Sequence, residues 1–591
     1  MNQDRTSLLN RSGAQAHPFR ALARFAAVVI VVGALATVAA QSLAALLPSE
    51  TIAAVGIDGL ADHKAKLQPF VDEWERLGLT QMLEETADEE GEDLDGLSDT
   101  LSGLDFFDLL GDEVWLSVSA SNFNPLPAVT VVARVSEAGA RVLGELLADG
   151  AQDATAQTFS EGSISFTVFD SEGEEFPVAA ALSGNFAALS TNPDTLRGVL
   201  RRYQGAAEPN FTDSVAYASA LAPLGAFTVA FTLDYPRVAD VLVPFAQGMG
   251  FDQSVARVAQ AFRTAGTFAG TALLTDGGIE SQSLQVLGDR SLDPTLYDLL
   301  SANAAYPSAV MRFVPTGALA VQAGNADIAG WWAYLNELAM GLQELGIGDI
   351  DSFLAENIGI DMQAMLFSWM GKGGGAISLS APAATAPGMT PESLLGDSVY
   401  LIEAKDEAAA NQGVAQFFMM AGAMASSFID PMGEGAPVAP ATRQSAGVTV
   451  TTYEFGEGLT FETAVAGGYL LIGTKAGSLD AALAANASGG PGMTTGLLAA
   501  LQQPVPANAR SISLSDMRPT ITSVADAVVS ELGMAAGLTG AADLDFDAVE
   551  ASSQAIAEYV RFIAQKVGGA YSYQTVDGGA VRSYGLTQVT W

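Results

Sequence analysis

Two aspartates, Asp105 and Asp361, are the side chains whose placement most suggests chemistry. Each follows a glycine and one apolar residue, at matching places in the two halves of the sequence. A pair of carboxyl groups is the machinery of glycoside hydrolysis, in which one group acts as the acid and the other as base or nucleophile. An aspartate after glycine also suits the start of a helix, where it accepts hydrogen bonds from free backbone N–H groups. We favour capping for both, and a carboxylate hydrolase is the weakest of our functional hypotheses.

Other catalytic groups are scarce. The chain has no cysteine and only two histidines, His17 and His63. This composition excludes disulfides, thiolate nucleophiles and Cys-ligated metal centres, and a Ser-His-Asp triad would have to use His63, which we expect at the surface. Asp543, Asp545 and Asp547 alternate and could hold a hard cation weakly, although a solvated or capping role is favoured. We therefore predict a protein that is not an enzyme and has no cofactor and no metal site.

One apolar segment is a candidate binding surface. Residues 414–429 are apolar almost all round, and a Gly/Pro-rich stretch follows at 431–440. Such a segment is typical of a buried helix or of a surface that receives a ligand or a partner. We favour core packing, and the alternative is a groove for a lipid tail or a partner helix. The candidate residues for that alternative are Phe417, Phe418, Met420, Met424 and Phe428.

The elements around these residues occur twice. The stretch 184–200, which reads as a strand, a turn and a helix, matches 467–483 without gaps, and the Asp-Gly-Gly turn at 276–278 recurs at 577–579. We also match residues 309–314 to the first strand, at 51–57. Hairpin turns between alternating strands favour an antiparallel sheet, and the interspersed helices make the fold class α+β. The sequence therefore predicts a tandem duplication of a sheet-plus-helices unit, at residues 48–290 and 305–591.

The N-terminus has the pattern of an export segment. Arginines precede an apolar stretch, and no acidic residue occurs between Asp4 and Glu50. This charge pattern predicts a cytoplasmic basic segment at 1–24 and a transmembrane anchor or signal peptide at 25–47. Small residues at 38–40 and at 42–44 would each suit a signal peptidase. We favour a retained single-pass anchor, with the rest of the chain outside the cytoplasm in either case.

The net charge narrows the choice of partners. The 591 residues carry a formal charge of −41. Nucleic acid is excluded as a partner, because binding phosphates requires a positive surface. The acidic character is best explained by solubility.

Three short stretches resemble landmarks of the bacterial DUF3352 family. They are LPSET at 47–51, LLGDE at 109–113 and LSTNPDTL at 189–196. The resemblance covers nearly everything after residue 47, although the second half keeps Gly371 and has Lys372 and Gly373 where the first half has acids. The family contains exported or membrane-anchored proteins of unknown function. The resemblance therefore implies a location and no catalytic residue.

These observations predict a membrane-anchored extracytoplasmic protein with a structural or interaction role in the cell envelope. Its expected partners are the membrane, through the N-terminal helix, and a protein partner or a second copy of the chain. The alternative is an extracytoplasmic binding module for an apolar ligand or lipid. That alternative predicts a large apolar pocket near residues 414–429.

Overall fold

The structure is a computed structural model that describes residues 42–79, 112–120, 127–150, 156–169, 177–248, 252–342, 349–381, 396–429, 440–455, 459–489, 505–523, 525 and 546–591. Several predictions fall outside these residues, namely the basic segment 1–24, most of the apolar segment 25–47, Asp105, and the acids at 543, 545 and 547. The described residues combine helices with antiparallel sheet, which confirms the predicted α+β class.

The described strands form one sheet of 20 strands. Those of the first half are β1 (Thr51–Asp58), β2 (Glu113–Ser119), β3 (Ala128–Arg134), β4 (Gln157–Glu161), β5 (Ile164–Phe169), β6 (Val178–Ser183), β7 (Phe186–Ser190), β8 (Val229–Asp234), β9 (Thr267–Thr275) and β10 (Gly278–Val286). Those of the second half are β11 (Ala320–Asn325), β12 (Met370–Ser378), β13 (Ser398–Ala404), β14 (Ala441–Ser445), β15 (Val448–Glu454), β16 (Thr460–Ala466), β17 (Tyr469–Gly473), β18 (Ser511–Asp516), β19 (Val567–Asp577) and β20 (Ala580–Val589).

The two halves place their strands in the same order. In the first half the order across the sheet is β4-β5-β6-β7-β3-β2-β1-β8-β9-β10, and each neighbouring pair is antiparallel. In the second half it is β14-β15-β16-β17-β13-β12-β11-β18-β19-β20, again antiparallel throughout. Every strand of one half therefore has a counterpart at the same place in the other.

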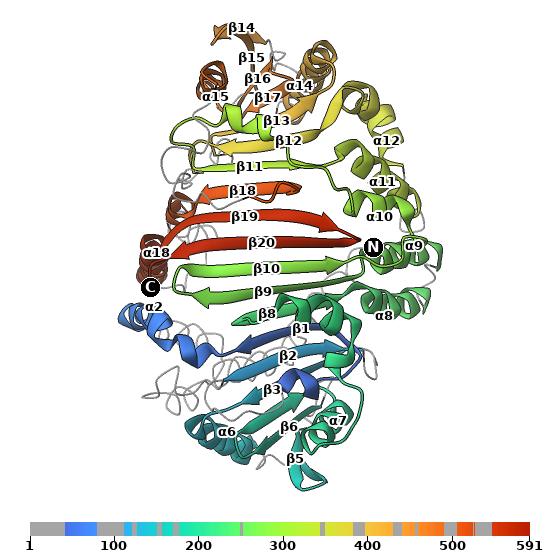
Figure 1. Ribbon diagram of the computed structural model, residues 1–591, viewed down its shortest axis with the longest axis vertical. Helices are drawn as coiled ribbons and strands as arrows, with labels where there is room; N and C mark the ends of the chain where they lie inside the picture. Colours follow the sequence, from blue (N-terminus) through green and yellow to red (C-terminus); the bar gives the residue numbers. More distant parts are fainter. Residues whose placement is uncertain are drawn as a thin grey trace, which may run out of the picture.

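The halves are joined by strand pairing. Strand β10 pairs with β20 along its whole length, from Gly278 opposite Gln588 to Val286 opposite Ala580. At the centre Gln282 lies opposite Tyr584, and Ser283 lies opposite Ser583. The sheet consequently runs without interruption along the long axis of the molecule, with β5 near one end and β14 at the other (Figure 1).

The helices lie mainly at the ends of the strands (Figure 1). One side carries α8 (Tyr235–Gly248), α9 (Asp252–Ala265), α10 (Pro294–Leu300), α11 (Ile328–Met340) and α12 (Ile350–Phe353). The other side carries α2 (Lys64–Arg76) and α18 (Phe546–Lys566). The outer strands pack against α6 (Glu137–Gly150) and α7 (Pro193–Tyr203) in the first half, and against α14 (Glu407–Ile429) and α15 (Ser478–Ala487) in the second.

Short helical turns complete the described elements. They are η1 (Leu43–Leu46), η2 (Leu60–His63), η3 (Phe211–Asp213), η4 (Ala216–Leu221), η5 (Ala222–Leu224), η6 (Ser308–Phe313), η8 (Leu354–Ile358) and η9 (Gln363–Phe367). Of all the helices that the structure describes, none is both long enough and apolar enough to span a membrane.

Core residues lie on both faces of the sheet. Successive residues of a strand point to opposite faces, and β3 illustrates this, because Val132 belongs to one apolar cluster while Val131 and Ala133 belong to another. The strand β17 repeats the pattern, with Leu471 in one cluster and Leu470 in the next. The outer part of each half is thus covered on both faces, which fits its runs of apolar residues.

The first helix of each half packs against a helix near the end of the other half. Trp74 of α2 meets Tyr559 of α18 with ring centroids 5.3 Å apart. On the opposite side, Arg257 of α9 lies 3.3 Å from Asp293, and Tyr334 of α11 donates a hydrogen bond of 2.9 Å to the same carboxylate. These crossed contacts hold the halves together at both ends of the central strands.

One predicted correspondence was wrong. Residues 309–314 do not form the first strand of the second half, because Ser308–Phe313 is the 3₁₀ helix η6 and the strand β11 begins at Ala320. The N–H groups of Val310 and Val314 bond back three residues, to Pro307 and Met311. Both valines are fully buried, so this short apolar stretch packs into the core of the second half. Its counterpart in the first half is η1.

Candidate functional site

The apolar helix α14 contributes to the core of the second half. Phe418 is 6% exposed, and its ring stacks on Tyr453 at 4.9 Å between centroids. Phe461 lies 5.4 Å from the same ring, and Phe455 lies 6.0 Å from it. Phe418 is therefore a core residue.

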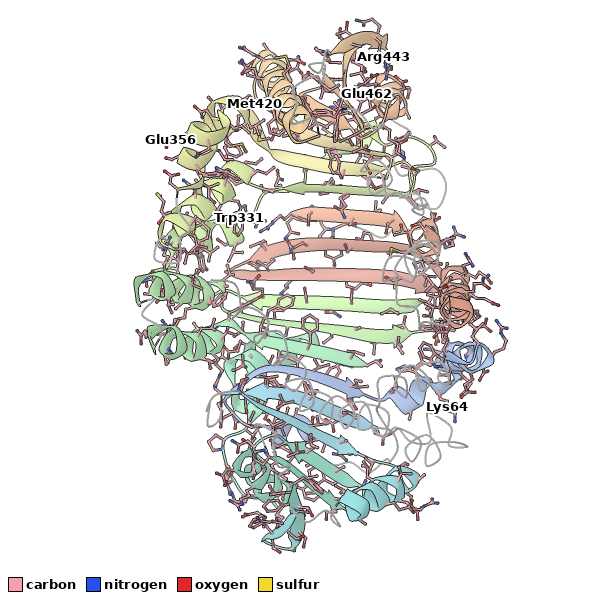
Figure 2. All side chains as sticks on the ribbon, turned by 180° about the vertical axis from the view of Figure 1, so that it is seen from behind. Lys64, Trp331, Glu356, Met420, Arg443 and Glu462 are labelled. Atoms are coloured by element: carbon pink, nitrogen blue, oxygen red, sulfur yellow. The ribbon has the colours of Figure 1, made fainter. Side chains whose placement is uncertain are left out.

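The other candidate residues of α14 are less enclosed. Phe417 packs against the same cluster and is partly buried, and Met420 is also half-buried. Figure 2 shows Met420 near one end of the long axis of the molecule. The side chains of Met424 and Phe428 lie outside the described residues. The structure thus brings Phe417 and Phe418 together against the sheet.

The corresponding place in the first half contains a small apolar cavity. It lies between α6 and the sheet and has a volume of about 10 Å³. Leu143 and Leu147 line it from the helix, and Val131 and Leu189 line it from the strands. This volume is about the size that holds one water molecule. It is too small for a lipid tail.

The two other described candidates are Asp361 and His63. Asp361 accepts a hydrogen bond of 2.9 Å from the N–H of Ala364, so it caps the turn that leads into η9, as we expect for a capping aspartate. His63 ends η2 and is half-buried, and burial together with the nearby Lys66 lowers the pKa of its imidazole. Asp361 thus satisfies one free N–H group of the backbone, and His63 lies directly before α2.

A polar cluster that we did not predict surrounds Glu113, at the start of β2. Glu113 is 7% exposed. Its Oε1 atom accepts hydrogen bonds from the Ser42 hydroxyl at 2.6 Å, from the Leu43 N–H at 2.8 Å and from the Trp115 indole at 2.9 Å. Its Oε2 atom lies 3.5 Å from Nε of Arg134 on β3. One buried carboxylate therefore fixes the first described residues of the chain to the sheet.

The residues after Ser42 are also held in place. The Arg202 Nε–H donates a hydrogen bond of 2.8 Å to the carbonyl of Leu46, and the Phe211 N–H donates one of 3.0 Å to the carbonyl of Leu47. Leu43 is 2% exposed and Leu47 is completely buried. These residues, which the sequence groups with the apolar segment 25–47, belong to the core of the first half. We call residues 42–47 the entry segment.

Comparison with known proteins places the chain in a family. The model of the family described as "Protein of unknown function (DUF3352)" matches residues 26–428. The chain belongs to the DUF3352 family. This confirms the family read from the sequence, although the match ends at residue 428 and the predicted resemblance continues beyond it. The family description assigns no activity.

Two solved structures of TP0453 show weak similarity to this DUF3352 protein. Crystal form III has a TM-score of 0.25 and 9% identity, and the match covers 45% of this chain and 89% of that one. Crystal form I has a TM-score of 0.23 and 8% identity, and the match covers 46% and 89%. None of the curated proteins compared with the chain matches it.

In this DUF3352 protein a second acid lies beside Glu113. Asp58 ends β1 directly opposite Glu113, and like charges at opposed positions of a sheet repel. Partial burial raises the pKa of Asp58, and the carboxylates of Glu113 and Asp112 raise it further. Burial also raises the pKa of Tyr217 in η4, with Glu113 and Asp58 adding to the effect. The cluster thus concentrates negative charge where the entry segment joins the sheet.

The second half of the DUF3352 protein has a different arrangement at the corresponding place. There Asn325 lies opposite Gly373, where the first half has Asp58 opposite Glu113. The carboxylate comes from Glu403 on β13, whose Oε2 accepts hydrogen bonds from the N–H groups of Lys372 and Gly373 at 3.0 and 2.8 Å. The acidic pair is therefore specific to the first half.

The chemistry open to these groups is limited. Among the described residues, no group of three or more histidine, aspartate or glutamate side chains is placed to hold a metal ion. Glu113 already receives bonds from three donors, so it is engaged in holding the backbone. The sequence signal was present in LLGDE at 109–113. The contact with Ser42, 71 residues away in the chain, could be found only from the fold.

Proposed function

We propose that this DUF3352 protein is a non-enzymatic, membrane-anchored extracytoplasmic protein with a structural or interaction role in the cell envelope. The observation that carries the proposal is the strand pairing between the halves. Ligand sites commonly lie in clefts between domains. Here β10 and β20 are hydrogen-bonded along their length, so the two halves meet as one sheet. Such a body is suited to presenting a long surface.

The bonds made by two buried acidic side chains support the proposal that the protein is not an enzyme. Glu113 holds the entry segment, and Asp293 caps α10 through the Leu296 N–H and binds Arg257 and Tyr334. Catalytic acids need a free lone pair or proton that faces a substrate. These two carboxylates are occupied by bonds that hold helices and strands together.

The two edge strands of the sheet support the proposal that the protein interacts with a partner. Within the described residues, β4 and β14 each pair with a strand on one side only. Unpaired edges can accept an additional strand from a partner or from a second copy. At the β14 edge Arg443 bonds at 2.8 Å to Glu462, which is 1% exposed (Figure 2).

We further propose that the two halves arose by tandem duplication. The same strand order in both halves supports this, as does the register of β10 with β20. Because Gln282–Tyr584 and Ser283–Ser583 are both opposed pairs, a local two-fold axis passes between them. The recurrence of 184–200 at 467–483, in β7 with α7 and in β17 with α15, supports it further.

Two measurements test the proposed function. Protease treatment of intact cells, after removal of any outer barrier, should degrade the body of the chain while a cytoplasmic control protein survives. Native mass spectrometry of the protein extracted gently from its membranes should then show added mass of another protein or of a second copy. An added mass equal to a lipid or a small molecule would instead favour the apolar-ligand alternative. Protection of the body in intact cells would refute the extracytoplasmic location.

A further inference from the structure

The entry segment is bound at both of its ends. At its start, the Ser42 hydroxyl and the Leu43 N–H bond to Glu113 at 2.6 and 2.8 Å. Toward its end, the carbonyl of Leu46 accepts from Arg202, which is itself 8% exposed. Every residue from Leu43 to Leu47 is buried. The entry segment therefore belongs to the core of the first half.

The second half repeats this element in the interior of the chain, where it follows α10. There η6 also comes before a proline and a strand, as η1 does before Pro48 and β1. Val310, Phe313 and Val314 are fully buried in the core of the second half. In the first half the matching cluster contains Leu43, Leu46 and Leu47. A short, buried apolar segment before the first strand is thus a part of each half.

We infer that the entry segment, residues 42–47, is part of the folded mature protein, so that the bond after Ala44 is not a processing site. The inference rests on the proposed export of the chain only in so far as it concerns processing. Of the two small-residue sites, the one at 38–40 leaves the whole entry segment in place. The one at 42–44 lies within it.

Cleavage after Ala44 would destabilise the fold, whereas cleavage after Ala40 would not. A cut after Ala44 would remove Leu43 from the core, and deletion of a buried leucine leaves an unfilled cavity. It would also remove two of the three donors that face Oε1 of Glu113, a carboxylate that is buried and must be paired. A cut after Ala40 costs none of these contacts.

The first test determines the residue at which the natural protein begins. The full chain is isolated from its own cells, and its N-terminal peptide is identified by mass spectrometry. We expect the chain to begin at or before Ser42, with or without the preceding segment. A mature chain that begins at Ala45 would overturn the inference. A chain with its original N-terminus that is found in the cytoplasm would refute the proposed location, and the second test would then decide the inference alone.

The second test examines the folded full chain in detergent with a broad-specificity protease. We expect the body fragment to begin at or before Ser42, because the entry segment is buried. The variant Leu43→Ala should speed cleavage within residues 42–50 by roughly tenfold or more, since loss of a buried leucine favours local opening. The control Val215→Ala, at a position that is 61% exposed, should not change this rate. Rapid cleavage between residues 43 and 47 in the unaltered protein, or equal rates in both variants, would overturn the inference.

Discussion

At the scale of single residues, Glu113 joins the entry segment to strands β2 and β3. It accepts hydrogen bonds from Ser42, Leu43 and Trp115, and it faces Arg134. A buried acceptor shared by several donors is expensive to remove, because each donor loses its partner without regaining water. The stability of the first half should therefore depend strongly on this carboxylate.

Replacement of Glu113 tests this directly. We expect Glu113→Ala to lower the free energy of unfolding by about 3 kcal/mol or more, because it leaves the buried donors of Leu43 and Trp115 without their acceptor. Glu113→Gln keeps one carbonyl oxygen as acceptor and should cost clearly less. Urea denaturation of the two variants measures the difference. Equal losses in both would show that the carboxylate oxygen is not the important contact.

Asp58 should make stability depend on pH. Because the pKa of Asp58 is raised above its ordinary value of 3.8, the folded protein binds this proton more tightly than the unfolded chain does. Stability from this group is therefore lost as the pH rises from 3.8 through the folded-state pKa, and it stays lost at neutral pH. We expect Asp58→Asn, which copies Asn325 of the second half, to raise the melting temperature at neutral pH.

Comparing the melting temperatures of Asp58→Asn and the unaltered protein at acidic pH checks this explanation. At about pH 3, below its ordinary pKa of 3.8, Asp58 is mostly protonated in both states, and the advantage of Asp58→Asn should largely vanish. Asp577→Asn, at an exposed turn, is the control for removing one negative charge from a chain of net charge −41. If both variants gain equally at neutral pH, overall charge explains the gain and the local repulsion does not.

At the scale of elements, two residues of α14 allow a test of whether this helix belongs to the core or forms a binding surface. Phe418 is enclosed by aromatic rings, whereas its neighbour Met419 is 47% exposed. Adjacent residues on one helix point in different directions, so they form a matched pair for substitution.

We expect Phe418→Ala to destabilise the second half by about 3–5 kcal/mol, because a large buried ring leaves a cavity. Met419→Ala should change stability by no more than about 0.5 kcal/mol, as is usual at exposed positions. Thermal and chemical denaturation of both variants measure this. A small effect of Phe418→Ala would mean that the ring cluster is loosely packed and would revive the ligand hypothesis.

At the scale of the whole molecule, the seam between β10 and β20 should make the halves unfold together. The crossed contacts of α2 with α18 and of α9 with α11 reinforce it. We expect hydrogen exchange in β2 and in β12 to accelerate at the same denaturant concentration, because the two halves share one sheet. Ser583→Pro, in the middle of β20, should lower that midpoint for both strands, since proline cannot donate a hydrogen bond within a sheet. Two separate midpoints in the unaltered protein would contradict a single cooperative body.

The sequence by itself determined the local structure and the family. Hairpin turns such as 276–278, the strand-and-helix stretches at 184–200 and 467–483, and the capping place of Asp361 were all read correctly, because these features depend on residues close together in the chain. The LLGDE stretch at 109–113 likewise marked the family without revealing the role of Glu113.

Only the tertiary structure decided that residues 43–47 belong to the core and how the halves join. Residues 43–47 are apolar on all sides, and such a stretch suits a membrane as well as a protein core. Composition could not separate these two environments, and the bonds to Glu113 and Arg202 do. Likewise, the pairing of β10 with β20 joins a strand from the middle of the chain to one near its C-terminus. Contacts over such separations depend on the packing of the whole sheet and have no local signal.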